Sequence, residues 1–362
     1  MLYLGVSFAD ATIYGTLEQT YNESTTTLGG KVISTKTGIG EYQTGGSLIG
    51  FKGSEDLGSG LKASYLYEMG VTLQTSASAP SNRQAFVGLS GGFGAVRIGK
   101  QYSASFLNAV AADPGSATGS YGVLYLAPMT GYNGTEAPLR QDQAIQYDLP
   151  SFVDGLKLTI TKVWGGKNTA PTTADSLSTT ETNGIKTGDG TGIAISYASG
   201  PLYVGYTTDS VTNAGINFVT NDDSIAQTLT AAAVPATSNT IIAASATSKN
   251  KLNTLTATYN LGMAKLGYNT TKMSVGAQSL STNMMSVSVP LGAASVFLSS
   301  SSGKTTSGST LGAANLSALQ YGVNYGLSKR TVAYVHAGKV DVELATTTKK
   351  LSSYGIGVHH SF

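Results

Sequence analysis

The chain has 362 residues, of which 41% are hydrophobic and only 12% are charged, against about a quarter charged in typical soluble domains. A formal net charge of +2 gives no overall field that would attract nucleic acid. No apolar stretch reaches the length of about 18 residues that a transmembrane helix needs, and a closed β-barrel is the other way to span a bilayer. The absence of cysteine is compatible with an oxidising compartment.

The first nine residues resemble the end of a signal-peptide apolar region. Ser7-Phe8-Ala9 offers a small-x-small cleavage site before Asp10. We therefore expect residues 1–9 to be a signal-peptide remnant or an N-terminal extension, with a single domain over residues 10–362.

From Asp10 onward, segments of about 8–12 alternating residues are separated by breaks that are alternately short and long, the rhythm of an up-and-down barrel. The first predicted strand is Asp10–Asn22, and a polar loop is expected over residues 23–42. The next four predicted strands are Gln43–Gly53, Leu61–Leu73, Asn82–Ser90 and Ala95–Tyr102.

Ser103–Leu139 then interrupts the rhythm, with scattered Gly, Pro, Ala and Tyr and no sustained period. A loop of this length inside a compact fold is either functional or a sign of a wrong assignment.

The alternation resumes at Arg140 and continues to the last predicted strand, Lys350–Phe362, for a total of about sixteen strands. In that last strand, Tyr354, Ile356, Val358 and Phe362 share one face, while small and polar residues share the other. The polar faces of the clearest strands consist of Gly, Ser, Thr, Asn and Gln, which suits a water-filled lumen. We predict an all-β fold, a 16-stranded antiparallel transmembrane β-barrel with short turns on one rim and long loops on the other.

Several separated motifs, in chain order, closely resemble the Gram-negative general diffusion porins, above all those of Neisseria and Burkholderia relatives. They are Tyr14-Gly15-Thr16, the stretch Gly50–Ala63, Asn82–Leu89, Gly92–Gly94, Gly99–Tyr102, Tyr147–Pro150, Leu327–Arg330 and the terminal Phe362. The resemblance implies a homotrimer in the bacterial outer membrane, among outer-membrane lipid and lipopolysaccharide, that lets ions and small hydrophilic solutes diffuse passively. It also implies short periplasmic turns and a third loop, here residues 103–139, folded into the pore.

The same resemblance assigns residues to the pore constriction. Arg83 and Arg140 match wall arginines of the family, and Lys100 is a plausible neighbour. Leu48 stands where relatives often carry a third arginine, so we expect a weaker basic cluster with at most a mild preference for anions. The candidate acids are Asp113 and Glu136 on the third loop and Glu18 on the first strand, although each of these charges could also be a solvated wall, rim or turn residue. Phe362 is implied to be a signal for the barrel-assembly machinery.

Two other classes of protein compete with a passive channel. An outer-membrane barrel enzyme would need a clustered catalytic site, but the chain has three histidines, two of them adjacent near its end, and no G-x-S-x-G setting. His359 and His360 point to opposite faces of a strand, which argues against a metal pair. A Ser/Thr/Gly-rich surface adhesin should have a fixed repeat period, which the spacing lacks. We expect no enzyme activity, no cofactor and no metal.

Overall fold

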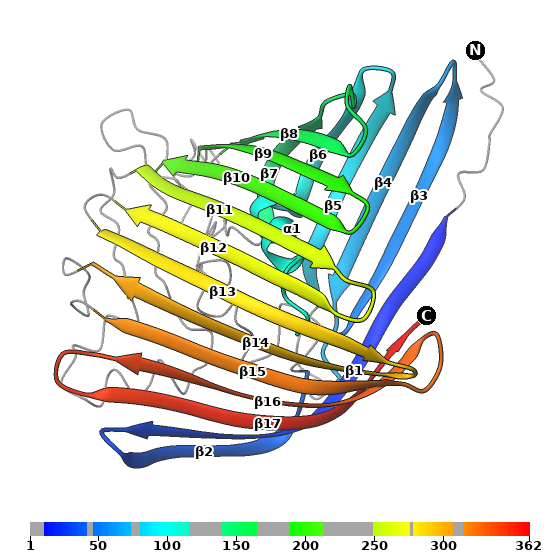
Figure 1. The fold of residues 1–362 in the computed structure, drawn as a ribbon. Coiled ribbons are helices and arrows are strands. Elements are labelled where there is room, and N and C mark those ends of the chain that lie inside the picture. The colour runs from blue at the N-terminus through cyan, green and yellow to red at the C-terminus, as the bar shows by residue number, and fades with distance from the viewer. Residues whose placement is uncertain are drawn as a thin grey trace, which may run out of the picture.

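The computed structural model describes residues 11–41, 46–73, 80–115, 140–164, 189–212, 249–275, 278–306 and 314–362. In this part of the chain, seventeen β-strands form one sheet and a short helix follows the sixth strand (Figure 1). The strands are β1 Thr12–Leu28, β2 Lys31–Gly40, β3 Leu48–Gly58, β4 Leu61–Gly70, β5 Ser81–Gly91, β6 Gly94–Tyr102, β7 Arg140–Asp148, β8 Leu156–Val163, β9 Gly190–Ser199, β10 Leu202–Thr212, β11 Lys249–Asn260, β12 Lys265–Val275, β13 Gln278–Leu291, β14 Ala294–Thr305, β15 Asn315–Gly326, β16 Thr331–Glu343 and β17 Thr348–Ser361. The helix, α1, spans Ala104–Val110.

The sheet closes on itself, because β1 pairs with β17 in antiparallel register. The N-terminal part of β1 pairs with β3, and its C-terminal part pairs with β2. β2 and β3 therefore share one position around the barrel as a single interrupted strand, and the seventeen strands occupy sixteen positions. The predicted 16-stranded antiparallel barrel is confirmed.

The prediction of a polar loop over residues 23–42 is wrong, because most of these residues belong to two strands. β1 continues to Leu28, turns through Gly29 and Gly30, and returns as β2. Both glycines have positive φ, 55° and 83°, which glycine adopts at no steric cost. The Thr- and Ser-rich sequence that suggested a loop pairs as a hairpin, since Thr has a high β-propensity. β16 and β17 are likewise joined by a short turn, between Glu343 and Thr348.

The two faces of the barrel differ as predicted. In β17, Tyr354, Ile356 and Val358 are exposed on the outer face, while Gly355 and Gly357 are buried on the inner face. The outer face carries many exposed Leu, Ile, Val and Tyr side chains, as a barrel in contact with lipid requires. No helix among the described residues is long and apolar enough to cross a membrane.

The chain ends at the seam of the barrel. Phe362 and Gly15 exchange two backbone hydrogen bonds, both of 3.1 Å, and the Phe362 ring covers Gly15. A Cβ at residue 15 would lie 2.7 Å from the Leu48 carbonyl oxygen, so the position has no room for a side chain. The terminal aromatic is therefore part of the contact that closes the barrel.

The described part of the third loop lies inside the barrel. α1 follows β6 but contacts β9, β10 and β11 on the other side of the lumen (Figure 1). The helix starts at Ser103, whose Oγ accepts a hydrogen bond of 3.0 Å from the Phe106 backbone N–H. Phe106 and Ala109 are buried, which orients the helix against the wall. The insertion was predicted, whereas the helix itself was not.

Candidate functional site

A tyrosine at the end of β6 gathers two arginines on one wall of the pore. The Tyr102 hydroxyl oxygen accepts hydrogen bonds from Arg83 Nη2 at 2.9 Å and from Arg140 Nη2 at 3.1 Å. The Arg140 guanidinium also lies 4.8 Å from the centre of the Tyr102 ring, and that ring stacks on Phe106 of α1 with centroids 5.0 Å apart. The start of the inserted loop thereby orients both predicted arginines, from β5 and β7.

The two arginines differ in how far their charge is balanced. Arg83 forms an ion pair of 2.7 Å with Glu68 of β4, and the two side chains are only 12% and 8% exposed. Glu68 also accepts a hydrogen bond of 3.1 Å from the Tyr14 hydroxyl. Arg140 forms no ion pair within the described residues, and its buried Nε has no hydrogen-bond partner there. Of the two arginines, only Arg83 has a carboxylate partner among the described residues.

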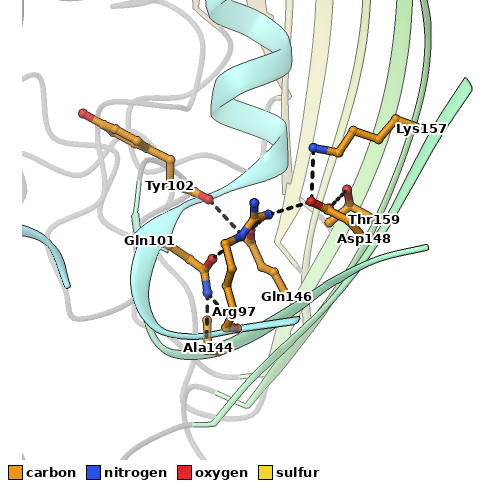
Figure 2. Close-up of polar contacts among 8 residues, drawn as sticks. All are labelled: Arg97, Gln101, Tyr102, Ala144, Gln146, Asp148, Lys157 and Thr159. Atoms are coloured by element: carbon orange, nitrogen blue, oxygen red, sulfur yellow. Dashed lines mark hydrogen bonds and ion pairs between the residues drawn. The ribbon is translucent and has the colours of Figure 1, made fainter. Parts of the chain in front are cut away.

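Nearer the short-turn rim, Arg97 of β6 adds a third arginine to the same wall (Figure 2). Its guanidinium contacts Gln101 Oε1 at 3.2 Å, Gln146 Oε1 at 3.1 Å and Asp148 Oδ2 at 3.2 Å. Asp148 also pairs with Lys157 at 3.3 Å, so one carboxylate is shared by two cations. We did not predict this arginine, although the period-two alternation of β6 places it on the inner face.

A lysine on β3 extends the basic wall towards the seam of the barrel. Lys52 Nζ lies 4.9 Å from the centre of the Tyr14 ring. Leu48, which we expected to stand in place of a wall arginine, is on the same face of β3 as Lys52, because an even number of positions separates the two residues. Lys52 and Arg97 add positive charge to the wall that carries Arg83 and Arg140.

Strand β10 on the opposite wall holds α1 through its polar side chains. Ser105 Oγ is 2.7 Å from Thr207 Oγ1 and also donates a hydrogen bond to the Asp209 carboxylate. The Tyr203 hydroxyl donates a hydrogen bond of 2.9 Å to Asn108 Oδ1. These contacts hold one side of the helix against β10, while Phe106 of the same helix stacks on Tyr102 of the arginine wall.

After the helix, the loop continues along β12, β13 and β15. Lys265 Nζ donates a hydrogen bond of 3.0 Å to the Ala111 carbonyl oxygen, and Ser286 Oγ donates one of 2.5 Å to that of Ala112. Gly267 allows the loop backbone to come close, since a Cβ there would lie 2.5 Å from the Ala112 oxygen. The described part of the loop crosses the lumen and is bound to the wall opposite Arg140.

The remaining predicted site residues lie in other surroundings. Lys100 forms an ion pair of 3.0 Å with Asp142 of the neighbouring strand β7, and both side chains are 31% exposed. Asp113 is buried, and its Oδ1 accepts a hydrogen bond of 2.9 Å from the Gly115 N–H, as a turn residue does. Glu136 lies outside the described residues.

Glu18 is fully buried on the inner face of β1. Its Oε1 accepts hydrogen bonds from the Tyr334 hydroxyl at 2.6 Å and from Thr20 Oγ1 at 3.3 Å. The carboxylate is thus held beside the seam of the barrel, where it reaches across β17 to Tyr334 of β16. Like Asp113 and Lys100, it stays a predicted selectivity residue.

Two further sequence expectations concern histidines and metals. His359 is half-buried and His360 is exposed, in agreement with opposite faces of β17. Within the described residues there is no group of three or more His, Cys, Asp or Glu side chains that could hold a metal ion.

The chain matches the Gram-negative porin family over residues 4–344. It belongs to this family. The porin is 37% identical over 148 residues to the major outer membrane protein P.IB of Neisseria meningitidis, a match that covers 40% of this chain and 42% of that relative. The matched region thus spans about two fifths of the curated relative. Family and relatives together place the porin in the bacterial outer membrane.

Solved structures extend the similarity to the whole fold. The anion-selective porin of Comamonas acidovorans has a TM-score of 0.72 at 21% identity, with 98% of this chain and 100% of that chain covered. OmpT of Vibrio cholerae in its trimer form has a TM-score of 0.63 at 14% identity, covering 98% and 99%. At these identities the likeness concerns the barrel architecture.

Proposed function

We propose that this porin forms a water-filled channel through which ions and small hydrophilic solutes diffuse passively, with a mild preference for anions. The observation that carries the proposal is the position of Arg140. Its guanidinium lies beside Arg83 on one wall, while the inserted loop is bound to the other. A confined and partly desolvated passage makes an unbalanced charge act more strongly than it would in bulk water.

The direction of the preference follows from the charges on the basic wall. Arg83, Arg97, Arg140, Lys52 and Lys157 outnumber the carboxylates Glu68 and Asp148 that pair with some of them. A solved neighbour with the same architecture is described as anion-selective, which supports the same sign here. These wall residues suit passage and selectivity, and we propose no chemical reaction for the chain.

Purified protein in a planar bilayer tests the proposal. Single channels should give ohmic current steps, and a tenfold gradient of potassium chloride should give a reversal potential of the sign expected for chloride preference. An absence of current steps would refute the channel, whereas a potassium preference would refute only the proposed selectivity.

We also propose that the barrel assembles as a homotrimer and that Phe362 acts as its assembly signal. One structural neighbour was solved in a trimer form, and Phe362 takes part in the pairing that closes the barrel. Changing Phe362 to Ser should lower the yield of trimer on unheated gels of outer membranes while synthesis continues. Phe362→Tyr, which keeps the aromatic ring, is the matched control. Trimer yield from the Ser variant equal to the wild-type yield would refute the signal role.

A further inference from the structure

A recess lies between the inserted loop and the barrel wall, near the short-turn rim. The loop contributes the segment from Val110, the last residue of α1, to Pro114, and the wall contributes residues of β11 to β15 (Figure 1). Gly262 of the turn between β11 and β12 marks its position near the rim. The volume of about 440 Å³ falls in the range of about 300–1,000 Å³ that small-molecule sites occupy. We call this recess the loop pocket.

The loop side of the pocket is held in a fixed position. Lys265 Nζ donates a hydrogen bond of 3.0 Å to the Ala111 carbonyl oxygen, and Ser286 Oγ donates one of 2.5 Å to that of Ala112. Both donors also line the pocket. A preformed site loses little conformational entropy when a ligand enters, so even a few hydrogen bonds contribute to affinity.

The wall side offers polar groups that both donate and accept hydrogen bonds. Ser288 of β13, Ser295 of β14 and Asn324 of β15 line the pocket and are partly exposed. Within the part of the chain that the structure describes, neither serine side chain forms a hydrogen bond. Asn324 Oδ1 lies 2.7 Å from His336 Nε2, which leaves the amide nitrogen of Asn324 to donate to a ligand.

The charge of the pocket differs from that of the arginine wall. Among its described lining residues, Lys265 and Asp113 carry one charge of each sign. An anion would be repelled by Asp113 and a cation by Lys265, whereas an uncharged solute meets neither cost. The pocket therefore favours a neutral ligand, although the narrow zone beside it carries an excess of positive charge.

We propose that the loop pocket binds a neutral polyhydroxyl solute of about the size of a monosaccharide. Hydroxyl groups of the solute match Ser288, Ser295 and Asn324, because every hydroxyl both donates and accepts. The C–H groups of the solute have apolar partners in Val110, Pro114 and Phe297. The site holds a solute beside the channel and does not depend on the ion selectivity of the arginines.

Protection of a single thiol tests the site, because the chain has no cysteine of its own. The full-length variant Ser295→Cys, in detergent, is alkylated with iodoacetamide in the presence and absence of D-glucose as the probe. At about three times its Kd, glucose leaves about a quarter of the sites empty, so alkylation should slow about fourfold. Ser288→Cys is a second, independent reporter. Ser54→Cys, on the exposed inner face of β3, is the matched control and should react at the same rate with and without glucose.

Two comparisons assign the chemistry of the bound solute. In the Ser295→Cys background, Ser288→Ala should raise the glucose concentration needed for protection by about two- to tenfold, as loss of one hydrogen bond predicts. Ser54→Ala in the same background should leave that concentration unchanged. Sodium lactate and glycine, an anion and a zwitterion of small size, should protect less than glucose does.

Three results would overturn the inference. Alkylation at an unchanged rate in glucose would mean that the pocket holds only water, and equal protection by lactate or glycine would refute the neutral class. Failure of both pocket cysteines to react, while that of Ser54→Cys does, would show that the pocket is closed to solutes. Because the assay requires no current, a conducting chain without protection refutes only the pocket, and a protected chain without conductance refutes only the channel.

Discussion

The two sides of the pore use polar groups for different purposes. On β3 to β8, Tyr102, Glu68 and Asp148 hold the arginines and Lys157 in fixed orientations, and two cations share Tyr102 and two share Asp148. On β10 to β13, hydroxyl, amide and backbone groups contact the inserted loop. One wall supplies charge, and the other positions the loop that faces it.

Small residues on the loop-binding wall make room for the inserted loop. Gly205 and Gly267 lie where the loop approaches the wall, and a Cβ at either position would collide with Asn108 or with the Ala112 carbonyl oxygen. Much of the inner face of β11 and β12 consists of hydroxyl and amide groups that bond to each other, such as Asn269 Nδ2 to Thr256 Oγ1 at 2.7 Å. A wall whose polar groups are satisfied internally adds little to the electrostatic field. The selectivity should therefore depend on one side of the pore.

Removing Arg83 and Arg140 together should reduce the ion selectivity more than any other substitution on the basic wall. We expect Arg83→Ala with Arg140→Ala to lower the ratio of chloride to potassium permeability by about two- to fivefold, since the field in the narrow zone loses two cations. The measurement is the reversal potential in a salt gradient. Each single variant removes one positive charge, and Arg83→Ala also leaves the Glu68 carboxylate without its ion-pair partner, so both should shift the reversal potential towards potassium preference.

Arg330 at the exposed short-turn rim provides a control for this experiment. Arg330→Ala removes the same charge outside the narrow zone and should leave the reversal potential almost unchanged. An equal effect of Arg330→Ala and Arg140→Ala would contradict a selectivity centre at Tyr102.

A side chain at Gly267 should displace the inserted loop from the wall that holds it. The Cβ of Gly267→Val would meet the Ala112 oxygen, so we expect the loop to move away from β12 towards the basic wall. Single-channel conductance should fall by about a quarter to a half as the passage narrows. Gly38→Val is the matched control, because a Cβ at Gly38 would meet nothing within 4 Å. Unchanged conductance in Gly267→Val would mean that the loop does not limit the current.

Asp209 should stabilise the loop position without contributing to selectivity. Its carboxylate accepts a hydrogen bond from Ser105 of α1, and a hydrogen bond to a charged group contributes about 1.5–3 kcal/mol. Asp209→Asn should lower the voltage at which channels close and leave the reversal potential nearly unchanged. A cycle with Ser105→Ala isolates the contact, since the double variant should differ little from either single variant. Fully additive effects would show that the two residues act independently.

The sequence predicts the barrel well, because a period of two records which face of each strand meets lipid. Composition is misleading in one place, since residues 23–40 are rich in Ser and Thr and suggest a loop, yet they pair as parts of β1 and β2. The motifs also name Arg83 and Arg140 as constriction candidates, and both side chains contact Tyr102 in the structure. Tyr102 brings the two guanidinium groups together, but the sequence could not assign it that role. The contact depends on how far side chains from three different strands, β5, β6 and β7, extend towards one another, and strand periodicity does not contain this information.

Substitution of Lys100 should have the smallest effect on the reversal potential and tests how far the selectivity centre extends along the basic wall. It lies on β6 between Arg97 and Tyr102, but its ammonium group forms an ion pair of 3.0 Å with Asp142. A partly exposed ion pair has almost no net charge and contributes little to stability. Lys100→Ala leaves the Asp142 carboxylate unpaired and Asp142→Asn leaves the Lys100 ammonium unpaired, so the two variants should shift the reversal potential in opposite directions. Each shift should be less than about a third of that in Arg140→Ala, because solvent screens charges on these partly exposed side chains. A shift in Lys100→Ala as large as that in Arg140→Ala would place Lys100 in the selectivity centre and extend that centre from Tyr102 along β6.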